Sequence, residues 1–354
     1  MRTSSQSRCE PSAGIRAGLE LRPEGEIELK KRVDPLHRLI PTPYRTDLSC
    51  MGKCVRLETN DAQVFEHITD LFSIYPPFTE QDVLFRWRII REALPKDTSF
   101  PLTRVAFSDS HLRCAEFGQR NFIAIDIDRR LAVVFISEEL ARDPSSLTYP
   151  FLDTLYCMCA AVLGFTTLFA NCIEVDGKAI LLLGPSRSGK TTLSYLAAKR
   201  GMRFLADDGV FLEIERGTLH AWGGFWPALI REEALEFCPE IRMLAESFSY
   251  GDFVFRRLER HSLVPQSFQS WVKPHCCVFL NRDAGISGGV SPVPLGLPSL
   301  RKRLGESLLF DEDVCFELQQ NSVLESLAQL PAFEISYAGD PAVVIRAIST
   351  LEIG

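Results

Sequence analysis

The feature that most constrains this chain is a glycine-bounded loop between an apolar run and a helical pattern. The loop fits the pattern G-x-x-x-x-G-K-[ST], and its residues are Gly184-Pro185-Ser186-Arg187-Ser188-Gly189-Lys190-Thr191, followed by Thr192. Leu181-Leu182-Leu183 before the loop predicts a buried strand. After the loop, the spacing of Leu193, Leu196 and Ala197 predicts a helix. A strand, such a loop and a helix in this order predict an α/β fold.

This arrangement predicts a binding site for the phosphates of a nucleotide. Glycines let successive backbone N–H groups face one concave surface, and the positive end of the following helix lies beside them. We therefore expect the loop and Thr192 to hold ATP, with the Lys190 ammonium on the outer phosphates and the Thr191 hydroxyl on Mg²⁺. The alternative is a chance match in a loop rich in Gly and Ser, which the flanking strand and helix disfavour.

A second element follows the predicted helix and ends in two carboxylates. The apolar run Arg203-Phe204-Leu205-Ala206 leads into Asp207 and Asp208, and Gly209 follows. In a phosphoryl-transfer site one of these acids can hold Mg²⁺ while the other accepts the proton of the attacking hydroxyl. The alternative is that Asp208 and Gly209 only form a hairpin turn. The glycine-bounded loop nearby in the sequence favours the catalytic interpretation.

The order of these motifs is similar to that of a known family. An apolar strand, the loop, a helix ending in Arg200-Gly201 and a strand ending in Ala206-Asp207-Asp208 follow one another. From Tyr149 to the C-terminus the sequence resembles the HPr kinase/phosphorylase family. The resemblance implies an HPr-kinase-like P-loop domain that uses ATP and Mg²⁺. It also implies that Asp207 is the acid/base residue and Asp208 a magnesium partner.

Two positions depart from the family pattern. Phe169 stands where the family usually has a His in the strand before the loop, and Thr192 stands where an acidic residue is common. A phenyl ring cannot transfer protons. The resemblance therefore carries over the kinase reaction and leaves the phosphorylase reaction and the substrate HPr open.

An aromatic stretch with a following arginine comes soon after the acid pair. The stretch is Trp222-Gly223-Gly224-Phe225-Trp226-Pro227, and Arg231 follows within reach of a phosphate or an acceptor peptide. Arg231 is a candidate catalytic residue, and a plain surface arginine is an equal alternative. For the tryptophans we favour a packing role. His220 and His261 have no partner visible in the sequence, so we expect them to be structural.

The rest of the sequence predicts a chain in three parts. Residues 1–45 are rich in Ser, Pro, Glu and Arg and predict a loosely ordered tail. Residues 46–148 predict an N-terminal α+β accessory domain, with a hairpin over 122–127 and 131–136. Residues 149–354 predict the P-loop domain, in which Asp176-Gly177 marks a hairpin and Asp340 and Pro341 start the last helix. Within the predicted P-loop domain, residues 285–298 are predicted to form a Gly/Pro-rich loop.

Charge and cysteine content exclude several partner classes. The 39 Lys and Arg against 46 Asp and Glu give a net charge of −7, which argues against a nucleic acid or an anionic membrane surface as partner. The 11 cysteines are an odd number and are scattered, which predicts reduced thiols and a cytoplasmic location more than a metal site. Leu155 to Ile173 carries no charge, but its Gly164 and the loop motif that follows predict a buried helix and strand instead of a membrane span.

Together these observations predict an ATP-dependent kinase. It transfers the γ-phosphoryl group to a hydroxyl, expected to be a serine of a protein or peptide. One alternative is a nucleotide-binding regulatory protein that has lost catalysis, against which the acid pair argues. A small-molecule kinase is another alternative. Because members of the family are frequently oligomeric, the resemblance is compatible with a homo-oligomer.

Overall fold

The first described strand begins at Tyr44, within the last two residues of the predicted N-terminal tail. The computed structural model describes residues 40–78, 82–92, 104–108, 111–118, 121–226, 228–250, 253–258, 271–282, 290–309 and 316–351. Most of the predicted tail, His261 and the first part of the predicted loop at 285–298 lie outside these ranges. The described residues form a mixed α/β fold with several sheets.

The N-terminal part of the chain contains a seven-stranded sheet with the order β1-β2-β3-β7-β6-β5-β4. Its strands are β1 (Tyr44–Cys50), β2 (Lys53–Thr59), β3 (Phe85–Glu92), β4 (Arg104–Ser108), β5 (Leu112–Phe117), β6 (Asn121–Asp126) and β7 (Leu131–Ser137). β3 runs parallel to both β2 and β7, and the other neighbouring pairs are antiparallel. The predicted hairpin over 122–127 and 131–136 is confirmed as β6 and β7.

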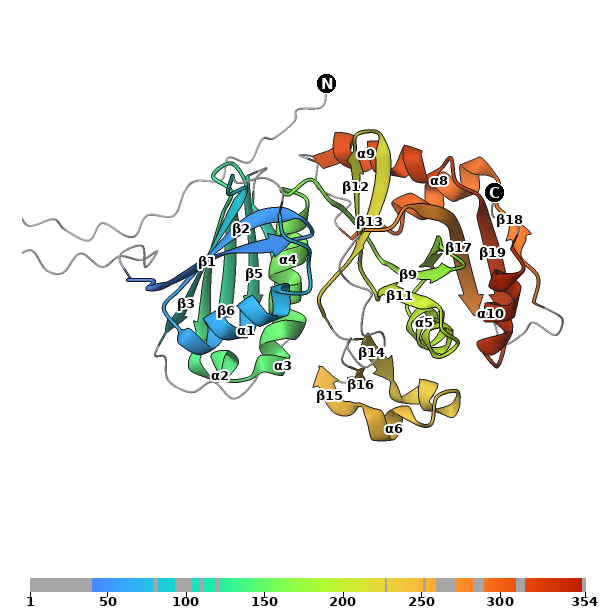
Figure 1. Ribbon diagram of the computed structural model, residues 1–354, viewed down its shortest axis with the longest axis horizontal. Helices are drawn as coiled ribbons and strands as arrows, with labels where there is room; N and C mark the ends of the chain where they lie inside the picture. Colours follow the sequence, from blue (N-terminus) through green and yellow to red (C-terminus); the bar gives the residue numbers. More distant parts are fainter. Residues whose placement is uncertain are drawn as a thin grey trace, which may run out of the picture. The chain divides into compact units, whose positions relative to one another are not determined.

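Helix α1 (Ala62–Phe72) packs against β1 and β2 of this sheet (Figure 1). It begins at Asp61, whose carboxylate accepts a hydrogen bond from the Val64 N–H. Val64, Ile68 and Phe72 are buried and lie four residues apart, so they share one face of the helix. This apolar face is what holds α1 to the sheet.

Four short helical segments follow β7. They are α2 (Glu138–Ala141), α3 (Pro144–Ser146), η1 (Leu147–Leu152) and α4 (Asp153–Ala160). Tyr156 of α4 lies in one hydrophobic cluster with Phe72 and Trp87 of the N-terminal sheet layer. Side chains from before and after residue 148 therefore share one hydrophobic core. The domain boundaries stay a prediction from the sequence. Within the described ranges, no helix is both long and apolar enough to cross a membrane.

The second large sheet has six strands in the order β11-β9-β10-β17-β19-β18. Its strands are β9 (Ala170–Val175), β10 (Lys178–Leu183), β11 (Arg203–Ala206), β17 (Pro274–Arg282), β18 (Val293–Pro294) and β19 (Ala332–Tyr337). β17 runs parallel to β10 and β19, whereas β9 is antiparallel to β10 and β11. The predicted turn at Asp176-Gly177 is confirmed, because it joins β9 to β10 with φ of 51° and 77°.

Helices cover both faces of this sheet (Figure 1). They are α5 (Lys190–Lys199) and α10 (Ala342–Ser349) on one face, and α8 (Leu297–Gly305) and α9 (Glu317–Leu327) on the other. Alternate residues of β10 enter the two cores: Ile180 and Leu182 pack with α5 and α10, and Leu181 packs with α8 and α9. A strand buried on both faces explains the uninterrupted apolar run before the loop.

Two three-stranded sheets complete the described fold. One contains β8 (Thr166–Leu168), β12 (Val210–Glu215) and β13 (Thr218–Gly223), and the other contains β14 (Ala228–Arg231), β15 (Glu246–Tyr250) and β16 (Phe253–Leu258). Two further helical segments are η2 (Glu232–Glu236) and α6 (Ile241–Leu244). The last helix, α10, begins at Ala342, one residue later than predicted, and the Asp340 carboxylate accepts a hydrogen bond of 2.8 Å from the Ala342 N–H, as expected of the predicted start at Asp340.

Candidate functional site

The glycine-bounded loop joins the carboxyl end of β10 to the first turn of α5, so the predicted strand and helix are both present. Gly184 and Gly189 have φ of 141° and 90°, which residues with a Cβ rarely adopt. A Cβ on Gly184 would lie 2.6 Å from the Leu280 carbonyl oxygen, and one on Gly189 would lie 2.1 Å from the Tyr337 hydroxyl. Both positions therefore require glycine.

The crest of the loop faces solvent and its base is buried. Pro185, Ser186 and Arg187 are exposed, whereas Ser188, Lys190 and Thr192 are buried. Arg187 has a φ of 69°, so the backbone turns sharply at the crest. Successive amides with alternating backbone conformations form concave anion sites.

Tyr337 holds the base of the loop in place. Its buried hydroxyl donates a hydrogen bond of 2.8 Å to the Ser188 carbonyl. In a planar trans peptide the carbonyl of residue 188 and the N–H of residue 189 point in opposite directions. By fixing the carbonyl, Tyr337 also fixes the direction of the Gly189 N–H at the start of α5. No motif of the sequence indicated this role for Tyr337.

Lys190 is almost completely buried, with 4% of its surface exposed. Its ammonium donates hydrogen bonds to the carbonyls of Gly184 at 3.0 Å and Pro185 at 3.3 Å. It also lies 3.8 Å from the centre of the Phe169 ring, a cation–π contact. Burial lowers the pKa of Lys190, and the negative charges of Asp208 and Asp207 oppose this shift. The lysine is thus held at the loop by its own carbonyls and by an aromatic ring.

Asp207 is the most constrained acid of the site. It is buried, and its Oδ1 accepts a hydrogen bond of 2.6 Å from the Asn171 amide. The Thr191 hydroxyl is a second hydrogen-bond partner of its carboxylate. Burial first, and then the charge of Asp208, raise the pKa of Asp207 to about 7. A carboxyl with such a pKa can take up and release a proton near neutral pH.

Asp208 lies beside Asp207 and is half exposed. Its carboxylate is 3.9 Å from the Lys190 ammonium, with 49% of its side chain exposed. Burial raises the pKa of Asp208, and the charges of Lys190 and Arg231 oppose the rise. The hairpin alternative for Asp208 and Gly209 is wrong, because β11 and β12 on either side belong to different sheets.

Arg231 lies at the end of β14, with its guanidinium 5.2 Å from the centre of the Phe255 ring. Its positive charge acts on Asp208, so the structure brings the predicted arginine into the electrostatic environment of the acid pair. Trp226 contacts the same region through its ring N–H, which donates to the Asp207 carbonyl at 2.9 Å. Trp222 and Trp226 are buried in the N-terminal hydrophobic cluster, which confirms their predicted packing role.

Two residues near the acid pair were missed by sequence reasoning. Asn171 on β9 donates to Asp207 and accepts a hydrogen bond of 3.0 Å from the Asp208 N–H, so one amide positions both acids. Asp153 at the start of α4 is the second: burial raises its pKa to about 7, and the charge of Asp208 contributes. The Cys157 thiol lies 3.6 Å from the Asp153 carboxylate and donates to it. A polar Asn within a buried strand was the available signal.

A cavity of about 420 Å³ lies beside the first residues of the loop. Phe169, Gly184, Pro185 and Phe279 contribute to its walls, and Arg303 and Glu334 add a pair of charges. The guanidinium and carboxylate of that pair are 3.0 Å apart. The cavity is large enough for a small polar molecule and adjoins the loop on the side of β17 and β19.

The donor atoms of this site fit magnesium and a nucleotide. The Thr191 hydroxyl and the carboxylates of Asp207 and Asp208 are all oxygen donors, which Mg²⁺ prefers. The loop offers backbone N–H groups beside the positive end of α5, where phosphates bind. The loop, Thr191 and the acid pair therefore offer the kinds of donor atom that Mg²⁺ and nucleotide phosphates bind.

Comparison with known proteins finds similarity among solved structures. No family model matches the chain, and no curated protein matches it. Among solved structures, the chain is similar to the HPr(Ser) kinase/phosphatase from Coxiella burnetii, with 12% sequence identity and a TM-score of 0.28. That comparison covers 52% of this chain and 92% of the other. The function proposed below rests on the site geometry.

Proposed function

We propose that this protein is a magnesium-dependent kinase that transfers the γ-phosphoryl group of ATP to a hydroxyl group. The observation that carries this proposal is the buried Asp207, which shares hydrogen bonds with Thr191 and Asn171 next to Lys190. A site that only binds a nucleotide needs no proton acceptor. A carboxyl with a pKa of about 7 beside a phosphate-binding loop serves phosphoryl transfer.

Each residue has a role that follows from its position. The backbone of Gly184 to Gly189 cradles the phosphates, and Thr191 and Asp208 hold Mg²⁺. Asp207 accepts the proton of the acceptor hydroxyl. Lys190 exchanges its hydrogen bonds with the loop carbonyls for phosphate oxygens. Bound MgATP supplies the phosphoryl group, so the protein contributes mainly position and charge.

The Arg231 guanidinium adds positive charge on the side of Asp208. We propose that Arg231 binds the phosphoryl group that is being transferred, since a guanidinium group can donate two parallel hydrogen bonds to phosphate oxygens. Phe169 has a different effect. Because it carries no titratable group and covers Lys190, we propose the kinase reaction alone, without its reversal by a proton shuttle.

We propose a serine hydroxyl of a protein or peptide as acceptor. A small-molecule acceptor is a second candidate, and the cavity beside the loop favours it. That cavity of about 420 Å³ holds a few tens of heavy atoms at most and has charged groups of both signs in its wall. The two candidates differ in the size of the product that carries the phosphate.

The test is magnesium-dependent transfer from γ-labelled ATP by the wild type and by Asp207→Asn, with host protein and host metabolite fractions as acceptors. We expect label on an acceptor with the wild type only, while both proteins bind ATP. Asp176→Asn is the matched control, because Asp176 lies in the exposed β9–β10 turn and Asn also adopts its φ of 51°. If Asp207→Asn and the wild type both bind ATP and neither transfers phosphate, a regulatory role replaces the kinase.

A further inference from the structure

A second cluster of chemically active side chains lies on the hairpin formed by β12 and β13. The turn at Arg216 and Gly217 has φ of 49° and 77°, as two-residue hairpin turns require. The register pairs Glu213 with His220 directly across the two strands. Glu215 lies two residues beyond Glu213 and thus on the same face of the sheet. The hairpin therefore gathers two carboxylates and one imidazole on one face.

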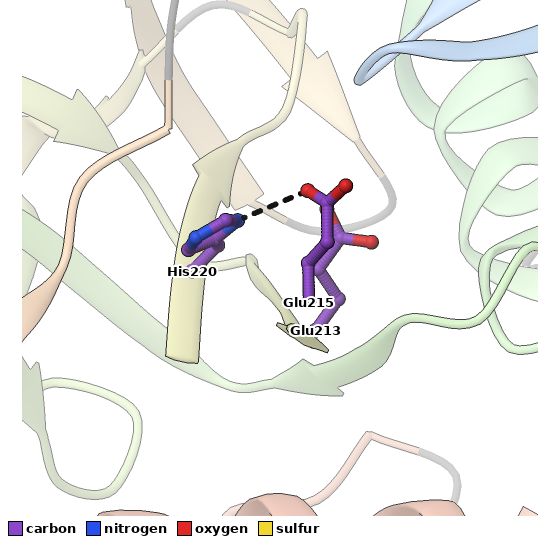
Figure 2. A group of neighbouring side chains, drawn as sticks. All are labelled: Glu213, Glu215 and His220. Carbon is purple, nitrogen blue, oxygen red and sulfur yellow. Dashed lines mark ion pairs between the residues drawn. The ribbon is translucent and has the colours of Figure 1, made fainter. Parts of the chain in front are cut away.

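The three side chains point toward one another, as Figure 2 shows. One potential ligand atom from each of Glu213, Glu215 and His220 lies within 4.8 Å of the others. His220 Nδ1 is 3.6 Å from the nearer Glu215 oxygen. Ligand atoms about 2.0–2.2 Å from a metal ion are themselves about 3–4 Å apart. Half of the Glu215 side chain is exposed, so it is free to make the small movement that closes such a shell.

Neighbouring aromatic residues fix the direction of two of these groups. The His220 ring stacks on the Trp271 ring with centroids 3.6 Å apart and planes tilted by 7°. The Trp222 ring N–H donates a hydrogen bond of 3.0 Å to Glu213. Metal sites typically hold their ligands by outer contacts of this kind, which orient the imidazole and the carboxylate before the ion binds.

The Nδ1 atom of His220 is an independent observation that points to a ligand. The residue is 5% exposed, and within the described part of the chain its Nδ1 atom has no hydrogen-bond partner. A buried polar atom without a partner costs free energy, so such atoms in native proteins usually meet another group or an ion. Burial lowers the pKa of His220, and the negative charges of Glu213 and Glu215 oppose this shift.

Lys53 is the residue that opposes metal binding here. Its ammonium lies 3.0 Å from the second oxygen of Glu213. The side chains of Glu213, Glu215 and Lys53 together carry two negative charges and one positive charge. A divalent cation would compete with the ammonium for Glu213, so removing the ammonium should strengthen the binding of the metal.

We propose that Glu213, Glu215 and His220 bind a zinc ion, with water in the remaining position. One imidazole and two carboxylates are ligands that Zn²⁺ accepts, and this set leaves one of its four tetrahedral positions open. The site is separate from the glycine-bounded loop. Its three ligands lie on the β12–β13 hairpin, and none of them belongs to the loop or the acid pair, so the zinc proposal does not depend on whether the protein is a kinase.

The test uses the full chain, freed of metal by a chelator, and titration with Zn²⁺ in a calorimeter. We expect one site whose affinity falls in Glu215→Gln and in His220→Asn by at least the roughly 10–100-fold that loss of a residue orienting a metal ligand costs. Glu66→Gln is the matched control, since Glu66 is an exposed acid on α1, and it should leave the affinity unchanged. Lys53→Met should raise the affinity.

X-ray absorption of the zinc-loaded protein identifies the ligands. Nitrogen and oxygen ligands without sulfur support the assignment, whereas sulfur ligands would place the ion at cysteines such as Cys276 and Cys277 and overturn it. Equal zinc affinity in the wild type and Glu215→Gln would also overturn it. A weaker affinity in Lys53→Met would remove Glu213 from the ligand set and refute the proposed site.

Discussion

Replacing Tyr337 by Phe tests whether the base of the glycine-bounded loop is positioned for phosphate. The change removes one hydroxyl from a buried side chain and leaves the ring in place. The Ser188 carbonyl then loses its hydrogen bond of 2.8 Å, and the peptide that carries the Gly189 N–H is free to rotate. We therefore expect weaker ATP binding, with a small loss of stability.

The magnitude follows from the value of one hydrogen bond. A typical intramolecular hydrogen bond contributes about 0.5–1.5 kcal/mol net, which corresponds to an increase of about 2- to 13-fold in the ATP dissociation constant if binding requires the fixed peptide. Isothermal titration with MgATP measures this change, and the unfolding midpoint in urea measures the loss of stability.

Tyr156→Phe is the matched control. Tyr156 is completely buried in the N-terminal hydrophobic cluster, and its hydroxyl donates a hydrogen bond of 3.3 Å to another hydroxyl, that of Tyr75. Its loss should lower stability by a similar amount without changing ATP affinity. If both variants change ATP affinity equally, or if Tyr337→Phe leaves it unchanged, the positioning argument is refuted.

The remaining predictions concern Asp207 and Gly189. Because Asp207 acts as a base with a pKa of about 7, kcat should rise with pH through neutrality and reach a plateau above it, and a flat profile would contradict this role. Its pKa is raised in the folded state, so the wild type should lose stability relative to Asp207→Asn as pH rises from about 4 to about 7, measured by urea unfolding. Gly189→Ala should abolish ATP binding, since its Cβ would lie 2.1 Å from the Tyr337 hydroxyl. Gly201→Ala has a similar φ of 84° with nothing within 4 Å, so it should bind ATP normally in the same titration.

The parts of the site that the sequence could predict are those set by short spacings. The loop, the flanking strand and helix, and the pair Asp207 and Asp208 are all defined within a few residues along the chain. Local propensity and hydrophobic period determine such elements directly. The turn at Asp176-Gly177 is determined in the same way, because φ above zero is required there.

The parts that the sequence did not reveal reach the site through pairing between distant strands. Tyr337 meets Ser188 only because β19 joins the sheet beside β17, which pairs with β10. No local pattern encodes this neighbour. The same holds for Trp222 and Trp226: their hydrophobicity predicts burial, but not that they enter the core of the N-terminal sheet.

Asn171 is an intermediate case, because part of its surroundings follows from the sequence. Once the Asp176-Gly177 turn is accepted, the hairpin register pairs Asn171 with Leu182, next to the start of the loop. An amide in the buried first part of β9 then needs a polar partner at that edge, since buried polar groups are hydrogen-bonded. The same reasoning from the Arg216-Gly217 turn pairs His220 with Glu213. The tight β12–β13 hairpin therefore brings residues of the proposed zinc site together, whereas Asn171 reaches the acid pair through the pairing of β9 with β11, which lies farther along the chain.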